Sequence, residues 1–178
     1  QAVSAYIDNP DITIDELAKY IKGPDFPTGG IIFGKKGIRQ AFKTGRGKIL
    51  VRGRFNIEVD KKGKETIIFT EVPYQVNTTA LVSKIGELAR EKVIEGIAAV
   101  NDETSDRAGL RLVIELKRGA IAKVVLNQLF SKTALQSSFG VINLALVEGR
   151  PQTLTLKQLV GYFVAHRQEV VTRRVRLD

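Results

Sequence analysis

Apolar and polar side chains alternate along the stretch from Lys48 to Val59. The apolar positions are Ile49, Val51, Phe55, Ile57 and Val59, and the polar positions are Lys48, Arg52, Arg54, Asn56 and Glu58. Successive side chains of a β-strand point to opposite faces. The pattern therefore predicts one strand that packs a core with one face and presents a basic row on the other.

Turn-forming residues predict the neighbours of this strand. Asp60-Lys61-Lys62-Gly63-Lys64 has the composition of a hairpin turn, because glycine accepts a positive φ. Glu65–Val72 is the expected partner strand, and Pro73 ends it. Two prolines and three glycines between Gly23 and Gly30 predict a break in regular structure. Upstream of the basic strand we expect a short strand over Ile31–Phe33, a small helix over Gly37–Phe42 and a tight loop over Lys43–Gly47.

Helical spacing and strand-like runs recur along the rest of the chain. One expected helix begins at the capping box from Thr13 to Glu16, another near Ile121, and the last at Thr155. A further helix is expected to begin at Asn77 or Thr78, and its apolar stripe is Leu81, Val82, Ile85, Leu88 and Ala89. Expected strands cover 97–100, 110–116 and 142–147, the last closed by a turn at 148–151. This mixture predicts an α+β fold, with a mixed, mainly antiparallel sheet flanked by helices and a long final helix.

Composition excludes several classes of function. The 178 residues include no cysteine and one histidine, which excludes disulfides and thiolate chemistry and makes a zinc site unexpected. No apolar run approaches the length that spans a bilayer and no signal peptide is visible, so we expect a cytoplasmic protein with no membrane partner. The chain has no methionine, even at position 1, and its last helix has no stop signal. We therefore expect a piece of a longer protein.

The positive charge is concentrated in one window. The formal net charge is +9, and residues 26–57 contain eight basic side chains and no acidic one. A concentrated positive field most often serves a polyphosphate backbone, so we predict contact with nucleic acid. The first candidates for phosphate contact are Arg46, Lys48, Arg52 and Arg54, and the further candidates are Lys35, Lys36, Arg39 and Lys43.

For the other motifs, a structural role explains the residues better than a catalytic or ligand-binding role does. The Gly45-Arg46-Gly47-Lys48 run matches neither a Walker loop nor a dinucleotide fingerprint, although its amides and arginine could contact a phosphate. His166 lies near Glu169 at helical spacing, which is ordinary on a helix surface. The acidic group Asp102, Glu103 and Asp106 lacks the spacing of a calcium loop and is typical of a polar turn. The tyrosines Tyr6, Tyr20, Tyr74 and Tyr162 are expected to be structural.

Seven blocks together resemble the A-subunit family of bacterial-type DNA gyrase and topoisomerase IV. The blocks are Gly23-Pro24-Asp25-Phe26-Pro27-Thr28, Lys43-Thr44-Gly45-Arg46-Gly47-Lys48, Glu71-Val72-Pro73-Tyr74-Gln75-Val76-Asn77, Ile94-Glu95-Gly96-Ile97, Asp106-Arg107-Ala108-Gly109-Leu110-Arg111, Leu135-Gln136-Ser137-Ser138-Phe139-Gly140, and residues 166–174. They occur in the family's order over essentially the whole chain.

The resemblance implies part of a type IIA topoisomerase, which cuts one duplex, passes another through it and reseals it. The family's catalytic tyrosine follows an arginine upstream of the Gly23 block, and no tyrosine here matches it. The chain is thus expected to have no catalytic residue and to need no cofactor itself, while a B subunit uses Mg²⁺ and ATP. The implied organisation is a helical lead-in over 1–22, a tower domain over 23–154 and the start of a coiled-coil arm over 155–178.

The resemblance implies three partners, which are double-stranded DNA, the gyrase B subunit and a second A subunit in a homodimer. The implied whole enzyme is an A₂B₂ assembly that supercoils DNA with ATP. The tower would support the bent gate segment of the DNA. Three alternatives stay open. The basic face could dock an acidic protein such as the B subunit, the chain could be the equivalent region of topoisomerase IV, or it could be an independent RNA-binding domain, although the strands lack paired aromatic residues typical of that class.

Overall fold

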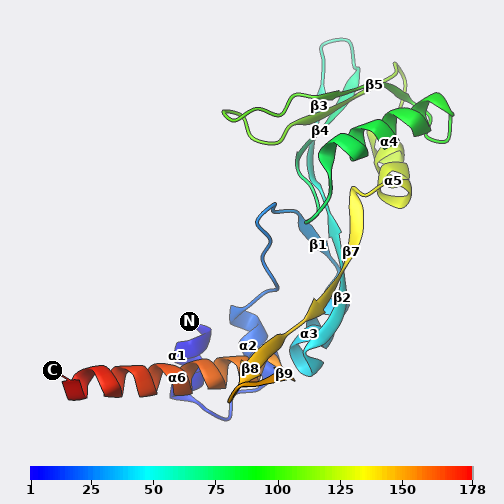
Figure 1. Ribbon diagram of the computed structural model, residues 1–178. Helices are drawn as coiled ribbons and strands as arrows, with labels where there is room; N and C mark the ends of the chain where they lie inside the picture. Colours follow the sequence, from blue (N-terminus) through cyan, green and yellow to red (C-terminus); the bar gives the residue numbers. More distant parts are fainter. Residues whose placement is uncertain (178) are drawn as a thin grey trace. The chain divides into compact units, whose positions relative to one another are not determined.

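The computed structural model describes residues 1–177, which form six helices and nine strands (Figure 1). The helices are α1 (Ala2–Asp8), α2 (Ile14–Tyr20), α3 (Lys36–Thr44), α4 (Thr78–Arg90), α5 (Ala122–Lys132) and α6 (Leu156–Leu177). The strands are β1 (Ile31–Phe33), β2 (Arg46–Arg52), β3 (Arg54–Val59), β4 (Glu65–Glu71), β5 (Ile97–Asp102), β6 (Leu112–Leu116), β7 (Gln136–Ile142), β8 (Leu144–Val147) and β9 (Arg150–Thr153). The mixed and mainly antiparallel α+β class is confirmed. Within the described residues, no helix is both long and apolar enough to cross a membrane.

The chain divides into two compact units. Unit 1 contains Gln1–Pro24, Gly34–Ile49 and the described residues from Phe139, and unit 2 contains Asp25–Phe33 and Leu50–Ser138. Strands β2 and β7 contribute residues to both units, and with β1 they form a sheet of order β1-β2-β7. The division at residues 22 and 154 that the family resemblance implies stays a prediction.

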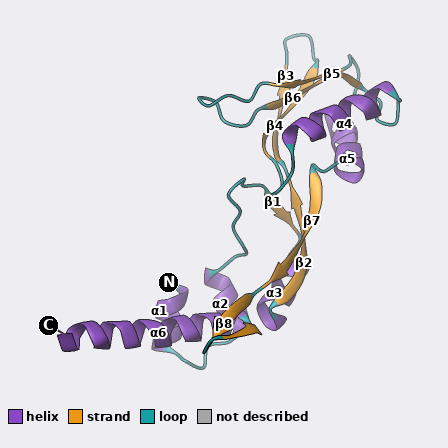
Figure 2. Ribbon diagram, in the orientation of Figure 1, coloured by secondary structure: helices purple, strands orange, loops and turns teal. Residues whose placement is uncertain are grey.

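Unit 2 is a four-stranded antiparallel sheet, of order β3-β4-β6-β5, that carries helices α4 and α5 (Figure 2). Ile67 of β4 pairs with Ile114 of β6, and both side chains are fully buried. They share one hydrophobic cluster with Leu81 and Ile85 of α4 and with Leu129 of α5. Alternation along the strands and 3.6-residue spacing along the helices thus bury the same apolar cluster from two sides.

Local signals set the ends of several elements as predicted. Thr13 and Glu16 form a capping box at the start of α2, and the side chain of Asn77 accepts the amide of Ala80 in α4. Strands β3 and β4 form the predicted hairpin, in which Gly63 has a φ of 76°. Helix α5 has no cap of its own, and the carboxylate of Glu65 accepts the amide of Ala122 at 2.6 Å instead. Such a cap from β4 satisfies a helix end that the local sequence leaves open.

The prediction of one basic strand from Lys48 to Val59 is wrong. The stretch forms two strands, β2 and β3, which belong to different sheets and meet at Gly53. The amide of Gly53 donates to the carbonyl of Leu135 at 2.9 Å, and a Cβ on Gly53 would lie 2.7 Å from the carbonyl oxygen of Glu71. The backbone is therefore too crowded there for a side chain, and the two ladders separate at this glycine.

Two further predictions about strands need correction. The expected strand over 142–147 is the end of β7 followed by β8, and the strand β9 was missed altogether. Glu148 and Gly149 both have positive φ, at 51° and 76°, which makes a two-residue hairpin turn between β8 and β9. The turn therefore covers 148–149, and the expected turn residues Arg150 and Pro151 lie in β9. Helix α1, within the expected helical lead-in, was not predicted as a separate element.

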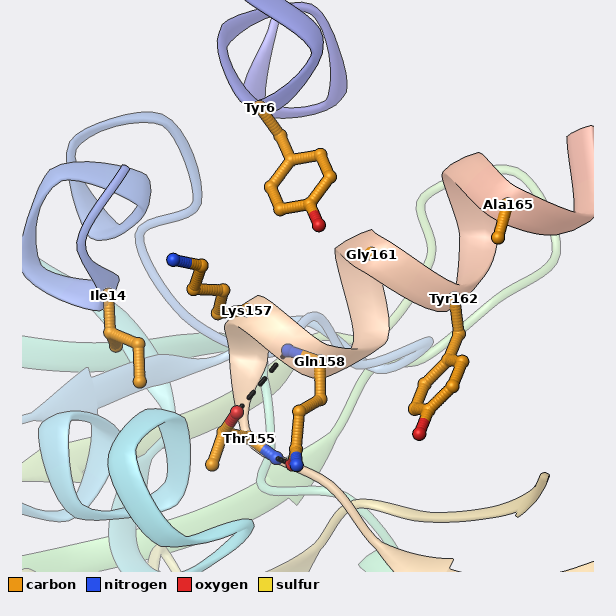
Figure 3. A pocket seen from close by; sticks show the side chains of 8 residues that line it. All are labelled: Tyr6, Ile14, Thr155, Lys157, Gln158, Gly161, Tyr162 and Ala165. Carbon is orange, nitrogen blue, oxygen red and sulfur yellow. Dashed lines mark hydrogen bonds between the residues drawn. The ribbon is translucent and has the colours of Figure 1, made fainter. Parts of the chain in front are cut away.

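Unit 1 packs its helices around α6, which begins at the predicted position. Leu17 of α2 and Phe42 of α3 are buried in one cluster with Val160 of α6. Thr155 and Gln158 form a reciprocal pair at the start of α6, because each side chain accepts the other residue's amide (Figure 3). This pair lines a hollow of about 490 Å³ together with Tyr6 of α1, whose hydroxyl lies beside Gly161.

Helix α3 lies directly on the backbone of β2. A Cβ on Gly47 of β2 would overlap the carbonyl oxygen of Gly37 and lie 2.8 Å from the amide nitrogen of Ala41. A Cβ on Gly37 would in turn overlap the carbonyl oxygen of Lys48. The predicted loop over Lys43–Gly47 is therefore wrong in extent. Helix α3 continues to Thr44, Gly45 reverses the chain at a φ of 78°, and β2 begins at Arg46.

We predict that Gly47→Ala lowers the free energy of unfolding by about 1–3 kcal/mol, because the added methyl group would force α3 away from β2. Gly140→Ala is the matched control, since Gly140 also lies in a strand, has no positive φ and has no atom within 4 Å of an added Cβ. Urea unfolding followed by circular dichroism measures both. Equal stability of the two variants would contradict the close packing of α3 on β2.

Candidate nucleic-acid interface

The eight predicted cations lie on separate surfaces. Six of them belong to unit 1, in or beside α3 and in β2, and two belong to unit 2. The six are Lys35, Lys36, Arg39, Lys43, Arg46 and Lys48, and all six are exposed. The two in unit 2 are Arg52 and Arg54, whose side chains make contacts within that unit.

Cations in and beside α2 and α3 surround one hollow in unit 1. Lys35, Arg39 and Lys43 follow at four-residue intervals and therefore lie on one side of α3. Together with Lys19 and Lys22 they line a hollow of about 440 Å³. Asp15 is the one carboxylate in this lining and lies 3.3 Å from the ammonium of Lys43. Both side chains of this pair are well exposed, so the pair stabilises the fold by about 1 kcal/mol at most.

Lys19 and Lys22 were missed by the sequence reasoning. They lie outside the acid-free window of residues 26–57, and acidic residues such as Asp15 and Glu16 precede them closely. The net charge of a sequence window that includes Lys19 and Lys22 is therefore low, because the nearby acidic residues cancel their charge. The spacing of Lys19 and Lys22, three residues apart at the end of a capped helix, was the available signal.

Arg46 and Lys48 lie on a second surface of unit 1. Gly47 and Ile49 of β2 face α3, as the close contacts of Gly37 show. Because side chains alternate along a strand, the exposed Arg46 and Lys48 point away from α3, to the opposite face of β2. Within residues 1–177, neither side chain lies in an ion pair. Their charge is available to a ligand without breaking an internal contact.

Arg52 is half-buried and held by three neighbours. Its guanidinium carbon lies 3.7 Å from the centre of the Phe33 ring and 4.7 Å from that of Phe130. Its Nε donates to Oε1 of Gln136 at 2.7 Å. Cation–π stacking and this hydrogen bond hold the side chain in unit 2.

Arg54 belongs to a network around Glu71. Its Nε lies 3.1 Å from the Glu71 carboxylate, which also accepts the amide of Gly30 at 2.6 Å. The Gly30 amide, and to a smaller extent Arg54, holds the pKa of Glu71 below its usual value, although partial burial opposes this. The network ties the loop before β1 to β4. Phosphate contact by Arg54 would compete with Glu71, and the predicted roles of Arg52 and Arg54 in DNA binding stay predictions.

The glycines of the Gly45-Arg46-Gly47-Lys48 run have a structural explanation. Gly45 takes the left-handed conformation, and a Cβ there would lie 2.6 Å from the carbonyl oxygen of Leu154. Gly47 permits the contact with α3 described above. The run thus positions Arg46 and Lys48 through packing, and the amides of Gly45 and Arg46 already donate to the Ala41 carbonyl and the Thr44 hydroxyl.

The other predicted features lie in ordinary environments. His166 is exposed on α6. Asp102 accepts the amide of Thr104 at 3.0 Å, and Glu103 lies 3.0 Å from Arg111 in an ion pair. Hydrogen bonds from Thr104 hold the pKa of Asp102 below its usual value. These contacts fit a polar turn between β5 and β6.

Two surfaces of exposed cations in one unit of an α+β chain are the electrostatic pattern that nucleic-acid-binding proteins commonly show. The chain belongs to the DNA gyrase/topoisomerase IV A-subunit family, whose model matches residues 1–178. It is similar to the DNA gyrase A subunit of Treponema pallidum, with 73% identity over 177 residues that cover 99% of this chain and 22% of that relative. The Escherichia coli counterpart is 55% identical over 171 residues, which cover 96% of this chain and 19% of the relative. The chain thus spans about a fifth of the length of the curated relatives it matches, and the predicted family resemblance is confirmed.

We predict that Glu71→Gln lowers the free energy of unfolding at neutral pH by about 1 kcal/mol, because a neutral amide accepts the Gly30 hydrogen bond more weakly than a carboxylate does. The folded-state pKa of Glu71 is lowered, so its contribution is complete above the usual value of 4.5 and is lost as the pH falls through the lowered pKa. The difference between wild type and variant should therefore shrink as the pH falls below this usual value. Urea unfolding across this range measures it.

Glu58→Gln is the control, since Glu58 is exposed on β3 and has no ion pair within the described chain. The control should have nearly wild-type stability at both neutral and acid pH. A Glu71→Gln difference that stays constant between neutral and acid pH would contradict the role of the carboxylate charge.

Proposed function

We propose that this chain is a non-catalytic, DNA-contacting part of a type IIA topoisomerase A subunit, corresponding to its tower domain and the start of its coiled-coil arm. The observation that carries the proposal is the pair of exposed cationic surfaces in unit 1. One is the α2–α3 hollow with Lys19, Lys22, Lys35, Arg39 and Lys43, and the other is the β2 face with Arg46 and Lys48. We propose that both contact the phosphates of double-stranded DNA.

Phosphate contacts suit this function for an energetic reason. Bending a duplex over tens of base pairs costs several kcal/mol, which distributed contacts with the backbone can offset. Such contacts read no bases, so they support an enzyme that acts at many sites. Apart from Lys43, which pairs with Asp15, the cations of the two surfaces make no ion pair within residues 1–177, so they need not lose one on binding.

The wider assembly is also a proposal. The relatives are named as A subunits of DNA gyrase, so we propose that the whole enzyme pairs two A subunits with two B subunits and supercoils DNA with ATP in the cytoplasm. Mg²⁺ and ATP would act on the B subunit. We propose that the nucleophilic tyrosine lies in another part of the full-length protein, because the family's catalytic tyrosine follows an arginine and none of the four tyrosines of this sequence does.

We predict that replacing Lys35, Arg39, Arg46 and Lys48 with Gln weakens binding to a duplex of about 30 base pairs. The slope of log affinity against log salt should become less steep by about 3.6, since each of the four phosphate contacts contributes about −0.9. Fluorescence anisotropy measures the slope. The effect should be the same for duplexes of unrelated sequence, because the contacts are with phosphates.

The control replaces Lys61, Lys62, Arg90 and Arg118 with Gln, which removes the charge of two lysines and two arginines from exposed positions of unit 2. It should leave the slope nearly unchanged. An equal loss in the control, or a loss confined to one DNA sequence, would reject the proposed surfaces. If the wild type does not bind DNA but binds an acidic protein such as the B subunit to saturation, the cationic surfaces of unit 1 dock a protein instead.

A separate variant tests the cations that the sequence reasoning missed. Lys19→Gln with Lys22→Gln should make the salt slope less steep by about 1 to 2, since both side chains line the hollow with Arg39. Lys61→Gln with Lys62→Gln is the matched pair in unit 2. An unchanged slope for the Lys19 and Lys22 variant would exclude these two lysines from the DNA surface and leave it to the remaining unit 1 cations.

A further inference from the structure

A groove in unit 2 is separate from both cationic surfaces of unit 1. It has a volume of about 410 Å³ and lies between α5 and residues of β1, β2 and β3. We call it the phenylalanine groove, after Phe33, Phe55 and Phe130, which line it together with Ile31 and Leu126. Phe33 is 54% exposed and Ile31 is 41% exposed, so part of this apolar lining faces solvent. Volumes of this size accommodate small organic ligands.

The groove contains positive charge without a counter-ion. Arg52 lines it, stacked on Phe33 and near Phe130, and its one hydrogen-bond acceptor is the neutral amide of Gln136. None of the ion pairs within residues 1–177 includes Arg52 or the second cation of the lining, Lys123. A half-buried guanidinium has lost part of its hydration, and a bound anion would compensate that loss with charge-assisted hydrogen bonds.

The geometry points to a binding site for a small aromatic carboxylate, and we propose this as a second function of the chain, beyond DNA contact. The flat apolar body of the ligand would pack against Ile31, Leu126 and the phenylalanine rings. Its carboxylate would bind the free guanidinium nitrogens of Arg52 and the ammonium of Lys123. Asn127 supplies the remaining polar group of the lining.

The lining favours this ligand over nucleic acid. A nucleotide carries a polar base with several donors and acceptors, and burying them without partners is costly. Asn127 is the one uncharged side chain in the lining with such groups. The cations of unit 1, in contrast, are exposed and hydrated, as contacts with a hydrated phosphate backbone require.

The test uses 2-naphthoate as the probe and the neutral 2-naphthalenemethanol as its isostere. The chain has no tryptophan, so the fluorescence anisotropy of the naphthalene reports binding without interference. We expect naphthoate to bind with a dissociation constant of about 0.1 to 1 mM and the alcohol to bind at least about tenfold more weakly. NMR shifts should concentrate on residues of the groove, including Phe33 and Leu126.

Two variants and a control locate the site. Lys123→Gln and Phe33→Ala should each weaken naphthoate binding by about threefold or more, through charge and apolar contact respectively. Both side chains are exposed, so folding should be retained. Lys62→Gln removes one exposed charge from a hairpin turn of the same unit and should leave binding unchanged.

Three results would overturn the proposal. The first is equal affinity for naphthoate and the neutral alcohol, and the second is an equal effect of Lys62→Gln and Lys123→Gln. The third is displacement of naphthoate by a saturating duplex of DNA, which would assign the groove to nucleic acid. The Arg46→Gln, Lys48→Gln variant should bind naphthoate as wild type does, so this test and the DNA test can fail independently.

Discussion

The close approach of α3 to the backbone of β2 is the contact on which the arrangement of unit 1 depends. Gly37 and Gly47 face each other across it, and either added Cβ would overlap a carbonyl oxygen. Because the two backbones touch, Ala41 and Phe42 are buried while Lys35, Arg39 and Lys43 project outward. The same contact directs Gly47 and Ile49 inward and thus sends Arg46 and Lys48 to the opposite face of β2. Two glycines therefore position both sets of cations.

Cations with the same formal charge have different roles according to their surroundings. Arg54 is neutralised by Glu71, and Arg52 is stacked on aromatic rings, so both stabilise contacts within unit 2. The exposed lysines and arginines of unit 1 contribute little to the fold and keep their charge for a partner. Cations without an internal partner fit the proposed phosphate contacts, while the phosphate contacts expected of Arg52 and Arg54 stay predictions.

Units 1 and 2 also differ in the chemistry of their surfaces. In unit 1 the hollow between α2 and α3 is lined mainly by charged side chains, whereas the phenylalanine groove of unit 2 is lined mainly by apolar ones. The former suits a hydrated polyanion, and the latter suits a ligand with a small charged group on an apolar body. The two proposed sites therefore differ in the kind of ligand that they favour.

The amino-acid sequence by itself determined the fold class, the family, the capping box of α2, the β3–β4 hairpin and the helical stripes of α4 and α5. These features arise from neighbours within a few residues, whose spacing is visible in the chain. Only the tertiary structure decided that Gly53 divides the basic stretch between two sheets, because the crowding comes from Glu71 and Phe69, far along the chain. It also brought Lys19 and Lys22 to α3, paired Arg54 with Glu71 and set Arg52 between Phe33 and Phe130. Contacts between distant segments determine which charges remain exposed, and no local pattern encodes them.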